Sequence, residues 1–190
     1  MDNSHVRRGL HLGAEFNGAR GYSDSMSALV DAYRNGRHKD NQPFFSVLAA
    51  QTEAIERLCE NLQIVGFDDV SRSVADGRHT DAHTYRKNVV ESISYHRENF
   101  DLLRPDCVVV AGVQAHEAFL TIILPAIKYE GLVIRAWNPS PQAHRGRTLD
   151  WVRAYKDAVL LGENHEQPGP GERWTFKHAP RQKRFELIRE

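Results

Sequence analysis

Residues 107–111, Cys-Val-Val-Val-Ala, leave few possibilities for the fold of this 190-residue chain. Successive side chains of a strand point to opposite faces, so a run that is apolar at every position predicts a strand buried on both faces of a sheet. Three other apolar segments also predict strands, at residues 10–16, 62–67 and 131–137. Because helical patterns separate them, we expect an α/β protein with three α/β/α layers around a central, mainly parallel, four-stranded sheet.

The helices are predicted from apolar residues that recur every three or four positions. They are expected at residues 23–33, from Pro43 to about 62, and at 85–103, 112–123 and 147–161. Residues 1–161 are expected to form one domain, since a chain of this size leaves little room for two cores. Residues 162–190 are rich in glycine, proline and charge, and we expect an extension that packs on this domain or is partly loose, with a short strand at 173–176.

Charge and cysteine content exclude several classes of protein. The chain has 25 lysine and arginine residues and 25 aspartate and glutamate residues, so it lacks the basic excess of a non-specific nucleic-acid coat protein. A zero net charge is still compatible with a locally positive groove that binds DNA. Cys59 and Cys107 are too few for an iron–sulfur cluster or an all-cysteine zinc site, and Cys107 is expected to be a buried apolar residue. With no signal sequence or membrane span, we expect a cytoplasmic monomer that contacts no membrane and needs no metal or other cofactor.

Polar residues and glycine follow the predicted strands. In parallel α/β sheets, ligands bind in the crevice beyond the carboxyl ends of the strands. The residues expected to surround this crevice are Glu15, Phe16 and Asn17, then Asp68 and Asp69 at the end of the second strand, then Gly112, and finally Asn138 to Pro141.

Five short motifs, in the same order along the chain, resemble those of the uracil-DNA glycosylase superfamily. Asn138-Pro139-Ser140-Pro141 resembles its His-Pro-Ser-Pro motif, and residues 104–115 resemble its RPxxVVxxGxxA strand and helix start. Residues 14–18 occupy the place of its Gly-Glu-Ala-Pro-Gly or Gly-Met-Asn-Pro-Gly motif. Residues 42–45, Gln-Pro-Phe-Phe, resemble the Pro-Phe that follows, and residues 65–70 occupy the place of a strand that ends in Asn and Val.

The chain also departs from the pattern of this superfamily. Asn138 replaces the histidine of the last motif, and Asn17 replaces the proline of the first. Residues 23–41 are an insertion, and two cysteines cannot form the iron–sulfur cluster of the branch that has glutamate in its first motif. The resemblance, which covers about residues 9–161, therefore implies the fold more directly than it implies the substrate.

The resemblance implies a monofunctional DNA glycosylase, which flips a base out of DNA and hydrolyses its bond to the sugar. Glu15 or Asn17 would orient water and stabilise the positive charge on the sugar, with a slight preference for Glu15. Asn138 would donate to the O2 atom of the departing base, or else only form a turn before the proline. Phe44, or in second place Phe45, would stack on the base, unless both are ordinary core residues.

The side chain of Asp69 indicates which base the enzyme would release. Relatives that release uracil have asparagine there, which both donates and accepts, whereas a carboxylate only accepts. An acceptor suits the N4 amine of cytosine and disfavours the O4 atom of uracil. Since release of normal cytosine would be lethal, a modified cytosine is the favoured substrate, for example glucosylated hydroxymethylcytosine in phage DNA, with defence against phages as the role. The alternative is that Asp68 and Asp69 merely end a strand.

The last motif also supplies candidate DNA contacts, namely Ser140, Gln142, His144 and Arg145. Three other functions are also compatible with the sequence. The first is a uracil-DNA glycosylase of base-excision repair, and the second is a module that binds modified DNA without cutting it. The third is an α/β enzyme that acts on free nucleosides or nucleotides.

Overall fold

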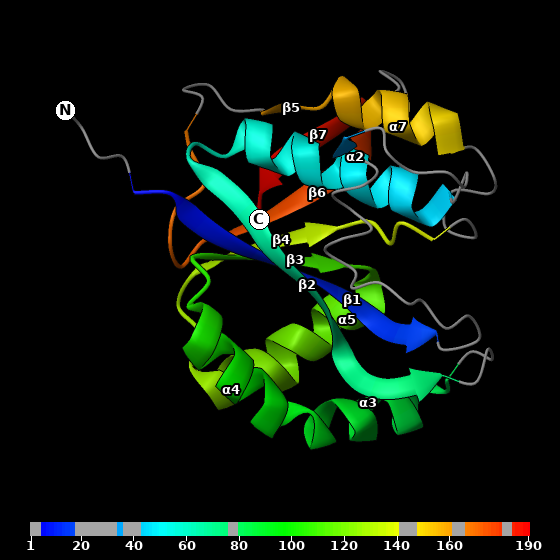
Figure 1. The fold of residues 1–190 in the computed structure, drawn as a ribbon, viewed down its shortest axis with the longest axis vertical. Coiled ribbons are helices and arrows are strands. Elements are labelled where there is room, and N and C mark those ends of the chain that lie inside the picture. Colours follow the sequence, from blue (N-terminus) through cyan, green and yellow to red (C-terminus); the bar gives the residue numbers. More distant parts are fainter. Residues whose placement is uncertain are drawn as a thin grey trace.

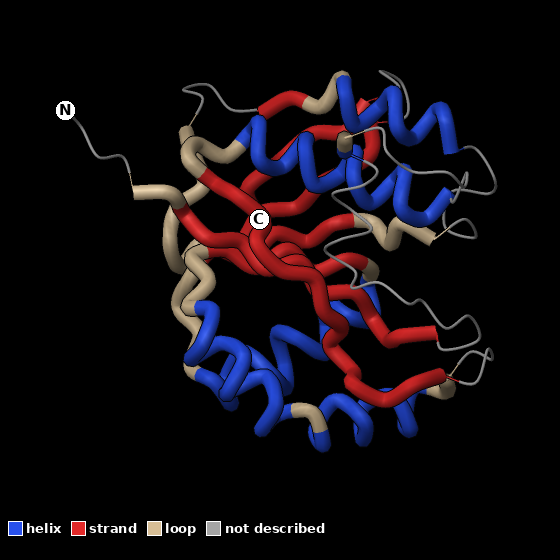
Figure 2. The backbone as a smooth tube through the Cα atoms, viewed as in Figure 1, coloured by secondary structure: helices blue, strands red, loops and turns tan. Residues whose placement is uncertain are grey.

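The computed structural model of the protein describes residues 5–17, 34–35, 43–75, 80–140, 148–160, 166–179 and 184–190. They form one seven-stranded sheet with helices on both faces (Figures 1 and 2). The strands are β1 (Arg7–Asn17), β2 (Leu62–Ala75), β3 (Cys107–Ala111), β4 (Leu132–Ala136), β5 (Val159–Leu160), β6 (Arg173–Ala179) and β7 (Arg184–Arg189). The helices are α2 (Pro43–Leu58), α3 (Ala82–Glu91), α4 (Ile93–Leu103), α5 (Val113–Ala118), the π-helical turn η1 (Phe119–Ile123), α6 (Leu124–Ile127) and α7 (Thr148–Lys156).

The order of strands in the sheet is β2-β1-β3-β4-β6-β7-β5. Strands β1 to β4 are parallel neighbours, as predicted, and β6 adds to β4 in the same direction. The prediction of four strands was wrong, because the C-terminal residues extend the sheet. Strand β7 runs antiparallel to β6, and β5 pairs with β7. The predicted α/β class with a mainly parallel sheet is confirmed.

Both faces of the sheet are packed against helices, as the valine run predicts. Helices α2 and α7 cover one face, here called the α2 face, and α3, α4 and α5 cover the other, the α4 face (Figure 1). Val109 lies in the core of the α2 face, which contains Ile55 and Tyr155. Val108 lies in the core of the α4 face, which contains Phe119. Cys107 is fully buried, in agreement with its predicted apolar role.

Several boundaries differ from the predicted ones for local reasons. The single helix predicted at 85–103 is two helices separated at Ser92, whose Oγ donates to the carbonyl of Asn88 and accepts from the backbone N–H of Arg72 in β2. The segment predicted as a helix at 112–123 continues to residue 127, and the helix predicted at 147–161 ends at Lys156, before β5. The predicted helix at 23–33 lies outside the described residues.

Strand β2 contains more residues than β1 can pair, and its register shifts at two places, between Gly9 and Leu10 and between Glu15 and Phe16 of β1. Gly9 of β1 pairs with Ile64, but the next residue, Leu10, pairs with Gly66, so Val65 forms a β-bulge. Strand β2 then runs to Ala75, because β1 pairs with it as far as Asn17. The prediction that this strand ends at Asp68-Asp69-Val70 was therefore wrong, and the bulge decides to which face each of these side chains points.

The part of the chain that the structure describes contains no helix with both the length and the apolar character needed to cross a membrane.

Candidate functional site

The candidate site lies at one edge of the sheet. Because β1 to β4 are parallel, their carboxyl ends meet there, and α2 begins at Pro43 beside them before it runs back across the sheet (Figure 1). Of the predicted residues, Phe44, Asn138 and Ser140 are described at this edge, and Asp69 lies within β2, level with the ends of β3 and β4. Glu15 and Asn17 are among the last residues of β1 and pair with Ser71 and Ala75 of β2. Their side chains are outside what the structure describes. Gln142, His144 and Arg145 also lie outside the described residues.

Asp69 faces α2 and lies directly over Gly13 of β1. The two residues are paired across the strands, and a Cβ atom at residue 13 would collide with Asp69 Oδ1. The carboxylate thus packs against bare backbone, in a space that only glycine leaves open at this position. Asp69 is half-buried, and Phe67, two residues earlier on the same face, packs against the core. This arrangement presents a carboxylate at the edge of an aromatic cluster.

Asp68 faces the opposite side of the sheet and is not part of the site, which corrects the expectation that both aspartates surround the crevice. Its carboxylate accepts hydrogen bonds from Tyr95 at 2.7 Å and from Asn99 at 3.1 Å, and it forms an ion pair with Arg72 at 2.6 Å. Asp68 therefore fastens β2 to α4.

The two candidate stacking residues have different positions. Phe45 is only 1% exposed and packs with Leu48 and Ala49 in the core, so its ring is inaccessible to a base. Phe44 is half-buried, and its ring meets that of Phe45 edge-on at 5.2 Å. Of the two, only Phe44 has ring surface at the edge of the sheet.

Asn138 forms the turn that was the alternative explanation for it. Its Oδ1 accepts from the backbone N–H of Ser140 at 2.9 Å. The other end of the amide, Nδ2, lies over Gly112, where a Cβ would be 3.8 Å from it and where the backbone φ of 101° also favours glycine. The turn occupies the amide oxygen, and the amide N–H₂ group is the end suited to donate to a ligand.

A buried glutamine ties this turn to the rest of the protein. Gln51 of α2 is fully buried, and its Nε2 donates to the carbonyl of Trp137 at 2.9 Å and to Tyr155 Oη of α7 at 2.6 Å. Its Oε1 is 2.9 Å from His11 Nε2 of β1. The Trp137 carbonyl can only accept, so the Gln51 amide must turn its nitrogen toward it and its Oε1 toward His11. Because Oε1 also only accepts, His11 must carry its proton on Nε2. Gln51 thereby connects two helices, β1 and the segment that holds Asn138.

Burial lowers the pKa of His11 to about 4, against a smaller opposing effect of its hydrogen bond to Gln51. His11 is therefore neutral in the folded protein at neutral pH, which agrees with its role as a single N–H donor.

The low pKa of His11 predicts that acid weakens the fold. Below pH 6.5, the ordinary pKa of histidine, His11 of the unfolded chain is protonated, whereas His11 of the folded protein stays neutral down to about pH 4. Between pH 6.5 and pH 4 this residue should therefore lower the free energy of unfolding by about 3 kcal/mol. Urea unfolding at several pH values measures the decline. In His11→Gln, which keeps an N–H donor but cannot titrate, the decline should be shallower, and an equally steep decline would contradict the assignment.

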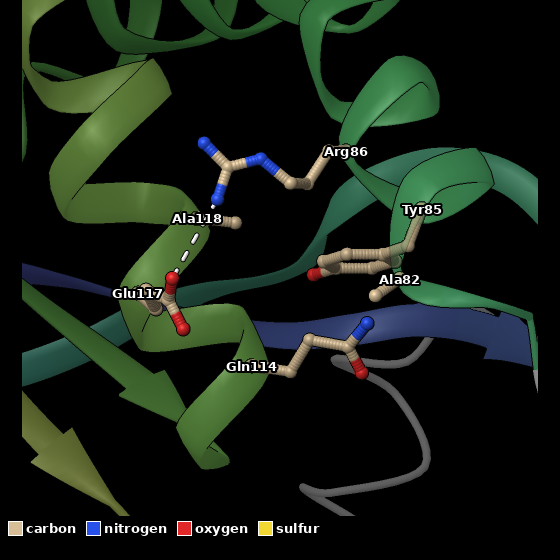
Figure 3. A pocket seen from close by; sticks show the side chains of 6 residues that line it. All are labelled: Ala82, Tyr85, Arg86, Gln114, Glu117 and Ala118. Carbon is tan, nitrogen blue, oxygen red and sulfur yellow. Dashed lines mark ion pairs between the residues drawn. The ribbon is translucent and has the colours of Figure 1, made fainter.

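A shallow hollow of about 90 Å³ lies elsewhere, between α3 and α5. Figure 3 shows Arg86 reaching across it toward Glu117, with which it forms an ion pair at 3.5 Å, beside Tyr85 and Gln114. Small-molecule pockets measure roughly 300–1,000 Å³, so this hollow is too small for a base. None of the predicted base-binding residues lines it.

Sequence reasoning missed His11, Gln51, Tyr155 and Trp137. The signal for Gln51 was a polar residue at the centre of an apolar stripe, four positions after Val47 and four before Ile55. A buried polar side chain at such a position must find partners, which is a reason to expect a network there.

No protein-family model, curated protein or solved structure matches the chain. Among the described residues, no group of three or more His, Cys, Asp or Glu side chains is arranged to hold a metal ion. The chemistry that the described part of the site offers is a carboxylate acceptor, an amide donor and an aromatic ring at one edge of the sheet.

Proposed function

We propose that the protein is a monofunctional DNA glycosylase that extrudes a pyrimidine from DNA and releases it, leaving an abasic site. The observation that carries the proposal is that Asp69 and Asn138 lie where β3 and β4 end, at the end of the sheet where α2 begins with Pro43 and Phe44. Recognition of a flipped base needs a flat apolar surface and polar groups that pair with its edge, and these three side chains supply both. Asn138 would stabilise negative charge on the departing base, and Glu15 or Asn17 would assist the attack of water on the sugar.

The proposed substrate is a modified cytosine. Asp69 offers only acceptor oxygens, which suit an exocyclic amine and repel the O4 atom of uracil. The contact with Gly13 supports this assignment, because it gives the carboxylate a defined place on the α2 face. Phage DNA that contains glucosylated hydroxymethylcytosine is a source of such bases, so the proposed biological role is defence against phages.

The experiment that tests the proposal uses the full chain and a panel of duplex and single-stranded oligonucleotides. Each carries one cytosine, hydroxymethylcytosine, glucosylated hydroxymethylcytosine or uracil, and alkaline cleavage reports abasic sites. Release of a modified cytosine supports the proposal. Release of uracil alone would indicate a repair enzyme instead, and tight binding of modified DNA without release would indicate a non-catalytic binding module.

Asp69→Asn should change the choice of base. Loss of the charged acceptor should lower release of the modified cytosine by about 10- to 100-fold, since hydrogen bonds to charged groups contribute about 1.5–3 kcal/mol. The new amide can pair with uracil, so release of uracil should rise above the wild-type rate. Both rates are measured with the same oligonucleotides.

Asp68→Asn is the matched control, because this neighbouring aspartate faces α4 and contacts Arg72, Tyr95 and Asn99. It should reduce stability and leave the preference among bases unchanged. A switch of preference in Asp68→Asn, or none in Asp69→Asn, would contradict the role of Asp69.

A further inference from the structure

Trp137 leaves much of its indole ring in solvent at the edge of the sheet that carries the candidate site. The residue follows β4 directly and precedes Asn138, and 43% of its surface is exposed. The other two tryptophans, Trp151 and Trp174, are partly and fully buried. Large exposed aromatic side chains are costly in water and are enriched at binding surfaces.

The exposed ring is held in a fixed position. The Trp137 carbonyl accepts from the buried Gln51, which fixes the backbone. The ring packs against Trp151 of α7, with centroids 5.3 Å apart and planes at 68°. Trp151 is itself stacked on His178 of β6 at 5.7 Å and packs on Phe185 of β7 at 5.3 Å. A rigid aromatic ring loses little entropy when a ligand binds to it.

We infer that Trp137 is a stacking surface for an unpaired nucleobase that neighbours the extruded one. The inference rests on the proposed function in that it takes DNA as the ligand. When a base leaves the stack, the adjoining bases lose a neighbour, and an aromatic ring beside the site replaces it. Stacking on a ring requires no particular base, because every base has a π-face. Trp137 therefore contributes affinity, and Asp69 reads the identity of the extruded base.

The test measures binding of a short fluorescein-labelled single-stranded DNA of mixed sequence by anisotropy, at several salt concentrations. Trp137→Ala should bind about 5- to 20-fold more weakly, in the lower part of the range known for base–aromatic stacks. The dependence of affinity on salt should keep its slope, since no phosphate contact is lost. Trp137→Phe, which keeps a ring, should recover most of the affinity.

Two controls separate stacking from loss of structure. Leu102 is another exposed apolar residue, 78% exposed, on α4 across the sheet, and Leu102→Ala should bind DNA as the wild type does. DNA should also quench the tryptophan fluorescence of the wild type, and this quenching should be largely lost in Trp137→Phe, because the two remaining tryptophans are more buried.

Equal binding of DNA by Trp137→Ala and the wild type would overturn the inference, and so would a wild type that binds no DNA. Either result would point to a protein partner for this ring. Failure of the proposed function has a different signature, since DNA would then bind through Trp137 while no base is released from any oligonucleotide. Base release with unaltered binding by Trp137→Ala would leave the proposed function intact and remove the stacking role.

Discussion

Asn138→Asp should lower the rate of base release by about 100- to 1,000-fold, the range measured when one donor to a developing negative charge is removed. The substitution separates the two roles of the side chain. Aspartate keeps the oxygen that accepts from the backbone N–H of Ser140, so the turn after β4 should survive. It removes the N–H₂ group and places a negative charge where the departing base becomes negative. Single-turnover rates on the preferred oligonucleotide measure the effect on the chemical step.

The thermal midpoint of Asn138→Asp serves as a control, and it should stay near that of the wild type because the turn is retained. Asn138→Ala, which loses the turn as well, should be less stable than Asn138→Asp. If Asn138→Asp released bases at the wild-type rate, Asn138 would be only a turn residue, and the stabilisation of the leaving base would have to come from elsewhere.

Gln51→Leu should lower the free energy of unfolding by about 3–5 kcal/mol. The side chain is fully buried, and its removal leaves the Trp137 carbonyl, Tyr155 Oη and His11 Nε2 without their partner inside the protein. Each unsatisfied buried group costs about 1–3 kcal/mol. Domains are stable by only about 5–15 kcal/mol, so a loss of this size should be clear in urea unfolding followed by circular dichroism.

Thr52→Val is the matched control for Gln51→Leu, because Thr52 is the next residue in α2 and is equally buried. Its Oγ1 donates to the Leu48 carbonyl of the same helix, so its replacement by the similarly shaped valine should cost about 1 kcal/mol. Equal losses in the two variants would show that Gln51 does not connect the elements around it.

The four parallel strands could be predicted because each contains its own signal. In β3 and β4 nearly every position is apolar, and this pattern follows from burial on both faces. The sequence signal for the C-terminal strands β6 and β7 is weaker. In β6 and β7 the buried residues Trp174, Phe176, Phe185 and Leu187 alternate with polar ones over short distances, and these strands gain their stability from pairing with β4 and with each other. Such pairing between distant segments leaves little trace in a local sequence pattern.

The candidate site was predictable as far as the ends of the strands, and no further. Asp69 and Asn138 were found because they follow or lie within apolar runs that predict strands. The network of Gln51, His11 and Tyr155 joins residues about 40 and 104 positions apart, and no spacing along the chain reveals it. Which of Asp68 and Asp69 faces α2 depends on the bulge in the pairing of β2 with β1, which is a property of two strands rather than of one.

The bulge at Val65 has an evolutionary consequence. If the two strands paired without the bulge, Leu10 would pair with Val65, the next pairs would move by one, and Asp68 would stand opposite Gly13 in place of Asp69. A slip of β2 by one residue along β1 would thus exchange the side chain offered at the candidate site, while both aspartates stayed in the sequence. Loss of Val65 itself would instead remove the bulge and keep Asp69 opposite Gly13, so the site tolerates a deletion there and is sensitive to changes in pairing.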